Sequence, residues 1–529
     1  SAALGLLRAN RLLDRTGRVV AVIGDGALGG GMALEAMNDA GQSGQDLIVI
    51  LNDNQMSISR NVGSLSRHLE NIRMSARYLR VKSRVSAGLM RIPLVGRPLV
   101  ALIERLKSSL RTFIHGRRAI FEDFGFQYFG PVDGHSLEDL QAVLHTIRSV
   151  RGPVLLHVCT QKGKGYDLAE REPHLYHGVP PFAIETGTAN GSAGSAGMPS
   201  SFSDVFGLHL ASLASRDPSI VAISAAMRIG TGLDGFAEAF PARFFDVGIA
   251  EQHAVTMAAG LAAGGLRPVV ALYSTFLQRA YDQVLHDVAL QRLPVVFAID
   301  RAGIVGEDGE THQGIYDIAF LSCIPGLILL SPSDYAELES MLEWALACPD
   351  GPVAIRYPRG RGVRDAASLP GATGSSERPA DPLALRLLRP GRDLTILSVG
   401  AMAVPVLSAA ERLEREHGIL CEVLDARAVK PMDWTGLSRS LERTGCLMTV
   451  EDGTLAGGFG ASVAATLSRH GIRIPLHLAG VSDAPLPQGS RSELHIRESL
   501  DSDGLVRRAL SLLRGEVGPP GPDRRPDGT

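Results

Sequence analysis

The stretch Val19-Val20-Ala21-Val22-Ile23-Gly24-Asp25-Gly26 determines how the rest of this sequence is interpreted. Its apolar run predicts a buried strand, and the glycines after it predict a tight turn into a helix. Glycines let the backbone approach a diphosphate, and a helix N-terminus at that point favours an anion. The carboxylate of Asp25 would repel such an anion unless a cation lies between them. The stretch therefore predicts a site for a metal ion and a diphosphate.

A second metal ligand is expected from a neighbouring strand, because Mg²⁺ binds carboxylate, amide and phosphate oxygens together. The apolar run Leu47–Leu51 predicts that strand, and it ends in Asn52-Asp53-Asn54. Parallel strands place their carboxyl ends at one edge of a sheet, which is where α/β proteins bind ligands. We therefore expect Asp25 and Asn54 to share one Mg²⁺.

An alternative interpretation is a dinucleotide site, because Gly24, Gly26 and Gly29 also satisfy the pattern G-x-G-x-x-G. That pattern requires an acidic residue at the tip of the second strand, about 20 residues further on. Asp46 has roughly this spacing but precedes the strand, where it cannot reach a ribose. The metal–diphosphate interpretation is favoured, and NAD binding stays as the alternative.

Composition restricts the class of protein. A chain of 529 residues predicts three or four domains at about 150 residues each. The net charge of −3 argues against nucleic acid as a partner. The five cysteines form no CxxC pair, which is typical of a reducing, cytoplasmic compartment. No apolar run reaches the roughly 18 residues of a membrane span, and no signal peptide is recognisable.

Alternating apolar runs and helical patterns predict an α/β fold with mostly parallel sheets. Two segments rich in Gly, Ser, Ala and Pro predict linkers, and the final residues lack apolar content and are expected to be disordered. The predicted parts are a diphosphate- and Mg-binding domain at 1–186, a linker at 187–200, a second domain at 201–365, a linker at 366–385, a C-terminal domain at 386–515 and a tail at 516–529.

A basic insertion interrupts the first domain. Residues 60–118 contain 14 Arg or Lys but only Glu70 and Glu104 as acids. Such a segment could bind a membrane surface or nucleic acid through charge alone. A mobile helical lid beside a site for anionic substrates is favoured, because the segment directly follows Asn54.

The middle of the chain contains further candidate residues. Glu251 lies where a predicted strand at 244–246 passes into a helix, a usual place for ligands in α/β folds. Arg301 and Arg359 end two other predicted strands and could hold a phosphate or carboxylate between them. Asp308 and His312 lie in a glycine-rich loop, and histidine can move protons at neutral pH.

Several longer motifs resemble the 1-deoxy-D-xylulose-5-phosphate synthase family of transketolase-like thiamine diphosphate enzymes. They cover nearly all of positions 1–515. The motifs are GDGALGGGMALEAMNDAG, LNDNQMSIS, GPVDGHS, KGKGY, FDVGIAEQHAVT, YSTFLQRAYDQVLHDV, DRAGIVGEDGETHQG and RYPRG.

The resemblance implies a three-domain, transketolase-like fold and a homodimer dependent on thiamine diphosphate and Mg²⁺. It implies condensation of pyruvate with D-glyceraldehyde 3-phosphate to 1-deoxy-D-xylulose 5-phosphate and CO₂, which feeds isoprenoid, thiamine and pyridoxal phosphate synthesis. The implied metal and cofactor residues are Asp25, Gly26, Ala27, Asn54, Met56 and Tyr166, with Asp25, Asn54 and Met56 at the metal. The resemblance makes 201–365 an aminopyrimidine-binding domain, in which Glu251 would activate the aminopyrimidine ring. Tyr273, His177, Asp308 and His312 would face the reacting carbons, and Arg301, Arg359 and Arg279 would bind substrate.

The family also carries a Gly-His-Ser stretch and another histidine upstream of the position matching Ser1, so an N-terminally truncated chain is expected. Two alternatives therefore stay open at this point. One is a related enzyme, a transketolase or a pyruvate dehydrogenase component. The other is an inactive binding or regulatory fragment.

Overall fold

The computed structural model describes residues 1–56, 62–72, 119–179, 181–188, 201–348, 350–374 and 378–516. Most of the predicted basic insertion, most of the linker at 187–200 and nearly all of the tail lie outside the described residues. The chain divides into two compact units, one formed by residues 1–193 with 247–250 and the other by the remainder.

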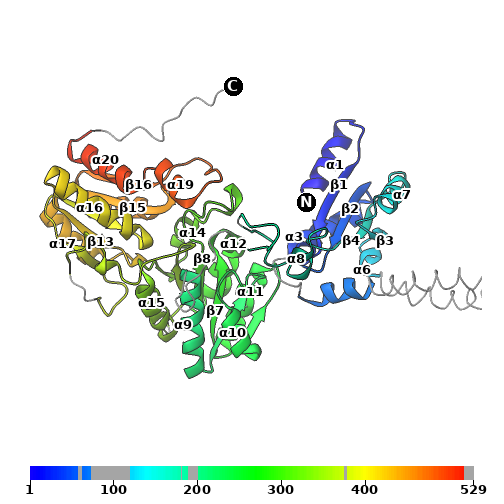
Figure 1. Cartoon of the computed structure of the whole chain (residues 1–529), viewed down its shortest axis with the longest axis horizontal. Helices are drawn as coiled ribbons and strands as arrows, with labels where there is room; N and C mark the ends of the chain where they lie inside the picture. The colour runs from blue at the N-terminus through cyan, green and yellow to red at the C-terminus, as the bar shows by residue number, and fades with distance from the viewer. Residues whose placement is uncertain are drawn as a thin grey trace, which may run out of the picture. The chain divides into compact units, whose positions relative to one another are not determined.

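Four parallel strands form the sheet described in the first unit, in the order β1-β2-β4-β3 (Figure 1). Both faces of β2 are buried, since Val49 packs in one apolar cluster and Ile48 in another. The strands are β1 (Val19–Gly24), β2 (Leu47–Asp53), β3 (Gln127–Asp133) and β4 (Val154–Cys159). The helices are α1 (Ala2–Leu12), α2 (Asp25–Leu28), α3 (Gly31–Ser43), α6 (Ala119–Asp123), α7 (Leu137–Ile147) and α8 (Asp167–Arg171).

The second unit contains a seven-stranded sheet in the order β14-β9-β10-β8-β7-β5-β6. All neighbours in it are parallel except β14, which runs antiparallel to β9. Its strands are β5 (Ile220–Ser224), β6 (Phe244–Asp246), β7 (Arg267–Tyr273), β8 (Val296–Asp300), β9 (Ile328–Leu330), β10 (Val353–Arg356) and β14 (Ala428–Lys430). The helices are α9 (Phe202–Arg216), α10 (Asp234–Ala239), α11 (Glu251–Ala263), α12 (Ser274–Leu277), α13 (Tyr281–Gln283), α14 (Asp317–Ser322) and α15 (Tyr335–Ala347).

A five-stranded sheet follows in the same unit, in the order β11-β13-β12-β15-β16, with only β11 antiparallel. Its strands are β11 (Arg386–Arg389), β12 (Leu394–Ser398), β13 (Cys421–Asp425), β15 (Leu447–Thr454) and β16 (Leu476–Val481). The helices are α16 (Ala403–His417), α17 (Trp434–Thr444), α18 (Phe459–Arg469), α19 (Arg491–Arg497) and α20 (Ser502–Leu513).

The predicted α/β class with mostly parallel sheets is confirmed, and two local details differ from expectation. The helix expected after Gly26 is two helices, because the glycine run 29–31 has low helix propensity and Gly30 is extended. Strand β14 comes from the predicted C-terminal domain but joins the seven-stranded sheet. Among the helices in the part of the chain that the structure describes, none is both long and apolar enough to cross a membrane.

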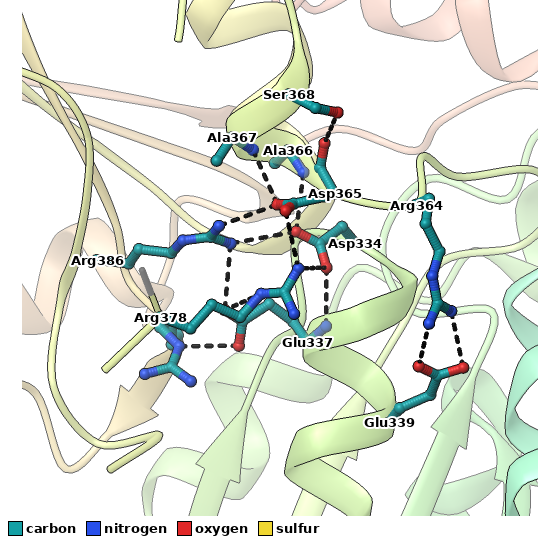
Figure 2. Close-up of polar contacts among 11 residues, drawn as sticks. Asp334, Glu337, Glu339, Arg364, Asp365, Ala366, Ala367, Ser368, Arg378 and Arg386 are labelled. Carbon is teal, nitrogen blue, oxygen red and sulfur yellow. Dashed lines mark hydrogen bonds and ion pairs between the residues drawn. The ribbon is translucent and has the colours of Figure 1, made fainter. Parts of the chain in front are cut away.

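A buried ionic cluster joins the two sheets of the second unit (Figure 2). Arg386 at the start of β11 contacts Asp334 and Glu337 at 3.3 Å and Asp365 at 2.9 Å. Arg427 contacts the other oxygen of Glu337 at 2.8 Å. Burial raises the pKa of Glu337 and the arginine charges oppose that rise. Asp365 and Arg386, which flank the predicted linker at 366–385, therefore pair with each other in this cluster.

Replacing Arg386 by Ala should destabilise the second unit by about 3–5 kcal/mol, because it removes a buried positive charge from the carboxylates of Asp334, Glu337 and Asp365. Both tryptophans of the chain, Trp344 and Trp434, lie in this unit, so their fluorescence during urea unfolding reports its stability. Arg364→Ala is the matched control. Its pair with Glu339 is exposed and should contribute only about 0.2–1 kcal/mol. Equal losses in both variants would contradict the prediction.

Candidate active site

Asp25 and Asn54 lie at the same edge of the first sheet. β1 and β2 pair with Gly24 opposite Asn52, so each polar residue directly follows the carboxyl end of its strand. Asp25 accepts hydrogen bonds from the backbone N–H groups of Gly26 at 3.0 Å and Gln55 at 2.7 Å. The side-chain oxygen of Asn54 accepts from the Met56 N–H at 2.9 Å. Gln55 has φ +63°, an uncommon conformation for a residue other than glycine, and the strand-end turn is thereby fixed.

The chemistry of this edge fits a hard cation. Burial, followed by the nearby charge of Asp53, raises the pKa of Asp25 to about 6. Two carboxylates with an amide oxygen beside them provide the oxygen donors that Mg²⁺ prefers. A cation would also relieve the repulsion between the two carboxylates. Gly26 and Ala27 lie in the first turn of α2, where the first backbone N–H groups of a helix have no acceptor within the helix itself.

A series of hydrogen bonds connects Asp53, which precedes this turn, to β4 and β3. His157 of β4 contacts Asp53 through Nε2 at 2.9 Å and the Tyr128 hydroxyl through Nδ1 at 2.7 Å. Asp53 also accepts from the Gln55 N–H at 3.2 Å. The sequence patterns did not predict these hydrogen bonds. The signal in the sequence was a histidine within the otherwise apolar strand Val154–Cys159.

The other two candidates of the first unit lie in the segment after β4. The Tyr166 hydroxyl donates to the Ile184 carbonyl at 2.7 Å, and its ring packs edge-to-face on Tyr176. Lys162 Nζ lies 2.8 Å from His177 Nδ1. Burial and the Lys162 charge both lower the pKa of His177, so its imidazole is neutral at pH 7 and accepts this hydrogen bond.

Glu251 begins α11, in agreement with the predicted strand-to-helix junction at β6. Its side chain is only 2 % exposed, and Arg279 holds both carboxylate oxygens at 3.3 and 3.4 Å. A buried carboxylate needs such a partner. Arg279 in turn lies over the ring of Phe276, 5.6 Å from its centre. The structure thus brings Arg279 to Glu251, a pairing that the sequence did not reveal.

The four residues Tyr273, Arg301, Asp308 and Arg359 converge in the second unit, and we call them the arginine cluster. Asp308 accepts from Arg301 through one oxygen and from Arg359, at 3.3 Å, through the other. The Arg301 guanidinium lies 4.0 Å from the centre of the Tyr273 ring. Arg301 has φ +55°, again uncommon outside glycine. The two arginines therefore already converge on one anionic group.

His312 lies beside the arginine cluster. Its ring packs edge-to-face on Phe276 at 5.5 Å, and Phe276 stacks on Tyr273 at 5.7 Å. Its Nδ1 lies 2.8 Å from the Thr311 hydroxyl. Burial raises the pKa of Tyr273 to about 12, so its hydroxyl stays protonated and available as a donor. Sequence analysis named Tyr273 and His312 but missed Phe276, which connects them.

Comparison with known proteins agrees with this architecture. Family models match residues 1–160 as 1-deoxy-D-xylulose-5-phosphate synthase, 199–363 as transketolase pyrimidine binding domain and 384–504 as transketolase C-terminal domain. A solved structure titled split gene transketolase, inactive beta4 tetramer is 30 % identical with a TM-score of 0.53, covering 60 % of this chain and 99 % of that one. The fold is therefore that of a transketolase-like enzyme.

Curated relatives show which family within this class the chain is similar to. The 1-deoxy-D-xylulose-5-phosphate synthase of Heliobacterium modesticaldum is 48 % identical, over 97 % of this chain and 77 % of its own length. That of Thermomicrobium roseum is 47 % identical, over 97 % of this chain and 79 % of its own length. The chain belongs to the 1-deoxy-D-xylulose-5-phosphate synthase family. It is a transferase of the transketolase type, and its domains imply dependence on thiamine diphosphate and Mg²⁺.

Proposed function

We propose that this chain condenses pyruvate with D-glyceraldehyde 3-phosphate to give 1-deoxy-D-xylulose 5-phosphate and CO₂. The observation that carries this function is agreement across the whole chain. Relatives of that name align with 97 % of it, and the polar residues expected from the family motifs gather at sheet edges. The assay that tests it supplies both substrates and measures the ketose phosphate formed.

Within this function, Asp25 and Asn54 would bind Mg²⁺ through their side-chain oxygens, with Met56 beside them. Gly26 and Ala27 would direct backbone N–H groups at the diphosphate, and Tyr166 would contact the cofactor. The support is the partly buried excess of negative charge at this edge, which calls for a cation. Thiamine diphosphate, when bound, supplies a carbon nucleophile and an electron sink for decarboxylation.

Glu251 would hold a proton at the aminopyrimidine ring. Its carboxylate is buried and Arg279 fixes its orientation, so the group is held ready without loss of side-chain entropy on binding. Tyr273, Asp308, His312 and His177 would face the reacting carbons, where the protonated Tyr273 hydroxyl can donate to a developing oxyanion.

The arginine cluster would bind the phosphate of the triose. Each guanidinium has five N–H donors in a planar fork, and the contacts to Asp308 leave others for a ligand. Asp308 would then keep both guanidinium groups aligned.

The proposal also includes the domain boundaries 1–186, 201–365 and 386–515. It includes a homodimer, which sedimentation tests, and a cytoplasmic location, which cell fractionation tests.

Arg301→Lys and Arg359→Lys should each lower the preference for the phosphorylated aldehyde by roughly ten- to a hundredfold. Lysine cannot reproduce the bidentate, charge-assisted contacts, which are worth about 1.5–3 kcal/mol. The measurement is the ratio of kcat/KM for D-glyceraldehyde 3-phosphate to that for D-glyceraldehyde. A constant ratio with both rates reduced would assign the arginines to pyruvate or to the fold instead.

A further inference from the structure

The loop that contains Arg301 and Asp308, two members of the arginine cluster, packs against the five-stranded sheet. Ile304 and Ile315 are buried in the same apolar core as Met448 and Val450 of β15. The Thr454 N–H donates to the Ile315 carbonyl at 2.9 Å. Residues 301–315, which we call the 301–315 loop, therefore depend for their position on a part of the chain more than a hundred residues away.

Two glycines let this loop closely approach Asp452 of β15 and residues 488–491, which we call the C-terminal segment. Gly303, at φ +77°, lies so near Asp452 that a Cβ there would be 1.8 Å from the carboxylate. Gly306, at φ +92°, would place a Cβ 2.8 Å from the Gly489 carbonyl and 2.9 Å from the Arg491 N–H nitrogen. These close contacts, of Gly303 with the Asp452 side chain and of Gly306 with the backbone at 489–491, leave no space for a side chain on the loop at either position.

Arg491, the first residue of α19, reaches from this segment to the arginine cluster. Its Nη1 donates to the Arg359 carbonyl at 3.4 Å, and its Nη2 lies 3.8 Å from Asp452. Asp452 in turn pairs at 3.2 Å with buried Arg356 of β10, the strand that leads to Arg359. Three residues before Arg491, the Gln488 side-chain amide donates to the carbonyl of Glu307 at 3.1 Å, and Glu307 directly precedes Asp308 in the sequence.

We propose that Arg491, assisted by Gln488, is a positioning residue for the phosphorylated substrate. It fixes the backbone of Arg359 from one side while Gln488 fixes the backbone before Asp308 from the other. The backbones at Arg359 and directly before Asp308 are thereby both tied to the C-terminal segment. The inference rests on the proposed function, and it gives the C-terminal segment a part in choosing the aldehyde.

The test is steady-state kinetics of the full-length protein with saturating pyruvate, thiamine diphosphate and Mg²⁺. Arg491→Gln should raise KM for D-glyceraldehyde 3-phosphate roughly tenfold, the effect of losing one charge-assisted hydrogen bond. The kcat/KM for D-glyceraldehyde and the Kd of thiamine diphosphate by calorimetry should stay within about twofold, because uncharged aldehyde and cofactor do not use the phosphate contacts. Gln488→Ala should act in the same direction more weakly.

Arg497→Gln is the matched control, because Arg497 lies on the same helix, is half exposed and pairs only loosely with Glu498 at 3.8 Å. It should behave as wild type. An Arg491→Gln variant that resembles this control, or that lowers kcat/KM for both aldehydes equally, would overturn the inference. If Arg491→Gln does not fold, the same kinetic measurements with both aldehydes are made on Gln488→Ala and Arg491→Lys. A wild-type protein that forms no ketose phosphate would instead overturn the proposed function itself.

Discussion

Turnover should fall by roughly 10²–10⁴-fold in a Glu251→Gln variant, the usual contribution of a general acid–base group. An amide has nearly the same shape but cannot supply the acid proton. Glu251 lies in the second unit and its partner is Arg279, so binding of the diphosphate and metal should survive. The measurement pairs kcat from product formation with the Kd of thiamine diphosphate from calorimetry.

The matched control for this prediction is Glu339→Gln. Glu339 pairs with exposed Arg364 in the same unit, and its loss should leave kcat unchanged. The assignment of Glu251 would be wrong if Glu251→Gln retained wild-type turnover. It would also be wrong if the variant lost cofactor binding together with turnover, since the residue would then serve binding alone.

Mg²⁺-dependent binding of thiamine diphosphate should be lost in Asp25→Ala. The substitution removes the carboxylate that is proposed to bind the metal ion and leaves the Gln55 N–H without its closest acceptor. A hard cation bridging protein and diphosphate requires that carboxylate, so added Mg²⁺ should no longer improve cofactor affinity. Calorimetric titrations with Mg²⁺ and with a chelator, on wild type and variant, measure this directly.

Asp39→Ala provides the control for Asp25→Ala. Asp39 lies on α3 in the same unit and pairs at the surface with Arg8, with about half of its side chain exposed (48 %). It should keep the full Mg²⁺ effect. A wild-type Mg²⁺ effect in Asp25→Ala would remove the metal site from this edge of the sheet.

Local pattern predicted the parts of the structure that depend on few neighbours. The run Val19–Ile23, the run Leu47–Leu51 and the rule that parallel strands end at one edge were enough to place Asp25 near Asn54, and the register confirms this. The junction before Glu251 was predictable for the same reason, since a strand that passes into a helix has a strong local signature.

Partnerships between distant residues were not predictable from one sequence. His157 meets Asp53 across 104 residues, and Arg491 meets Arg359 across 132. A lone histidine or arginine has the same local signature whether it is solvated or buried against a partner. The short strand β14 joins the seven-stranded sheet for a comparable reason, because its three residues have no pattern that selects a partner strand.

Electrostatic context was likewise hidden. Sequence analysis placed Arg301 and Arg359 together but could not show that Asp308 accepts from both. It named Asp25 as a metal ligand without the neighbouring Asp53 carboxylate that helps to raise its pKa to about 6. These properties arise from burial and from charges brought together by folding.

The most direct test of the central claim follows the carbon atoms of pyruvate labelled with ¹³C at its methyl and carbonyl positions. The protein is supplied with thiamine diphosphate, Mg²⁺ and D-glyceraldehyde 3-phosphate, and products are identified by NMR. We predict that both labelled carbons appear in 1-deoxy-D-xylulose 5-phosphate, with one CO₂ released for each ketose formed. The account would be contradicted if pyruvate were decarboxylated to labelled products but no ketose phosphate formed. It would also be contradicted if ketose formed only from a sugar donor while pyruvate stayed unchanged.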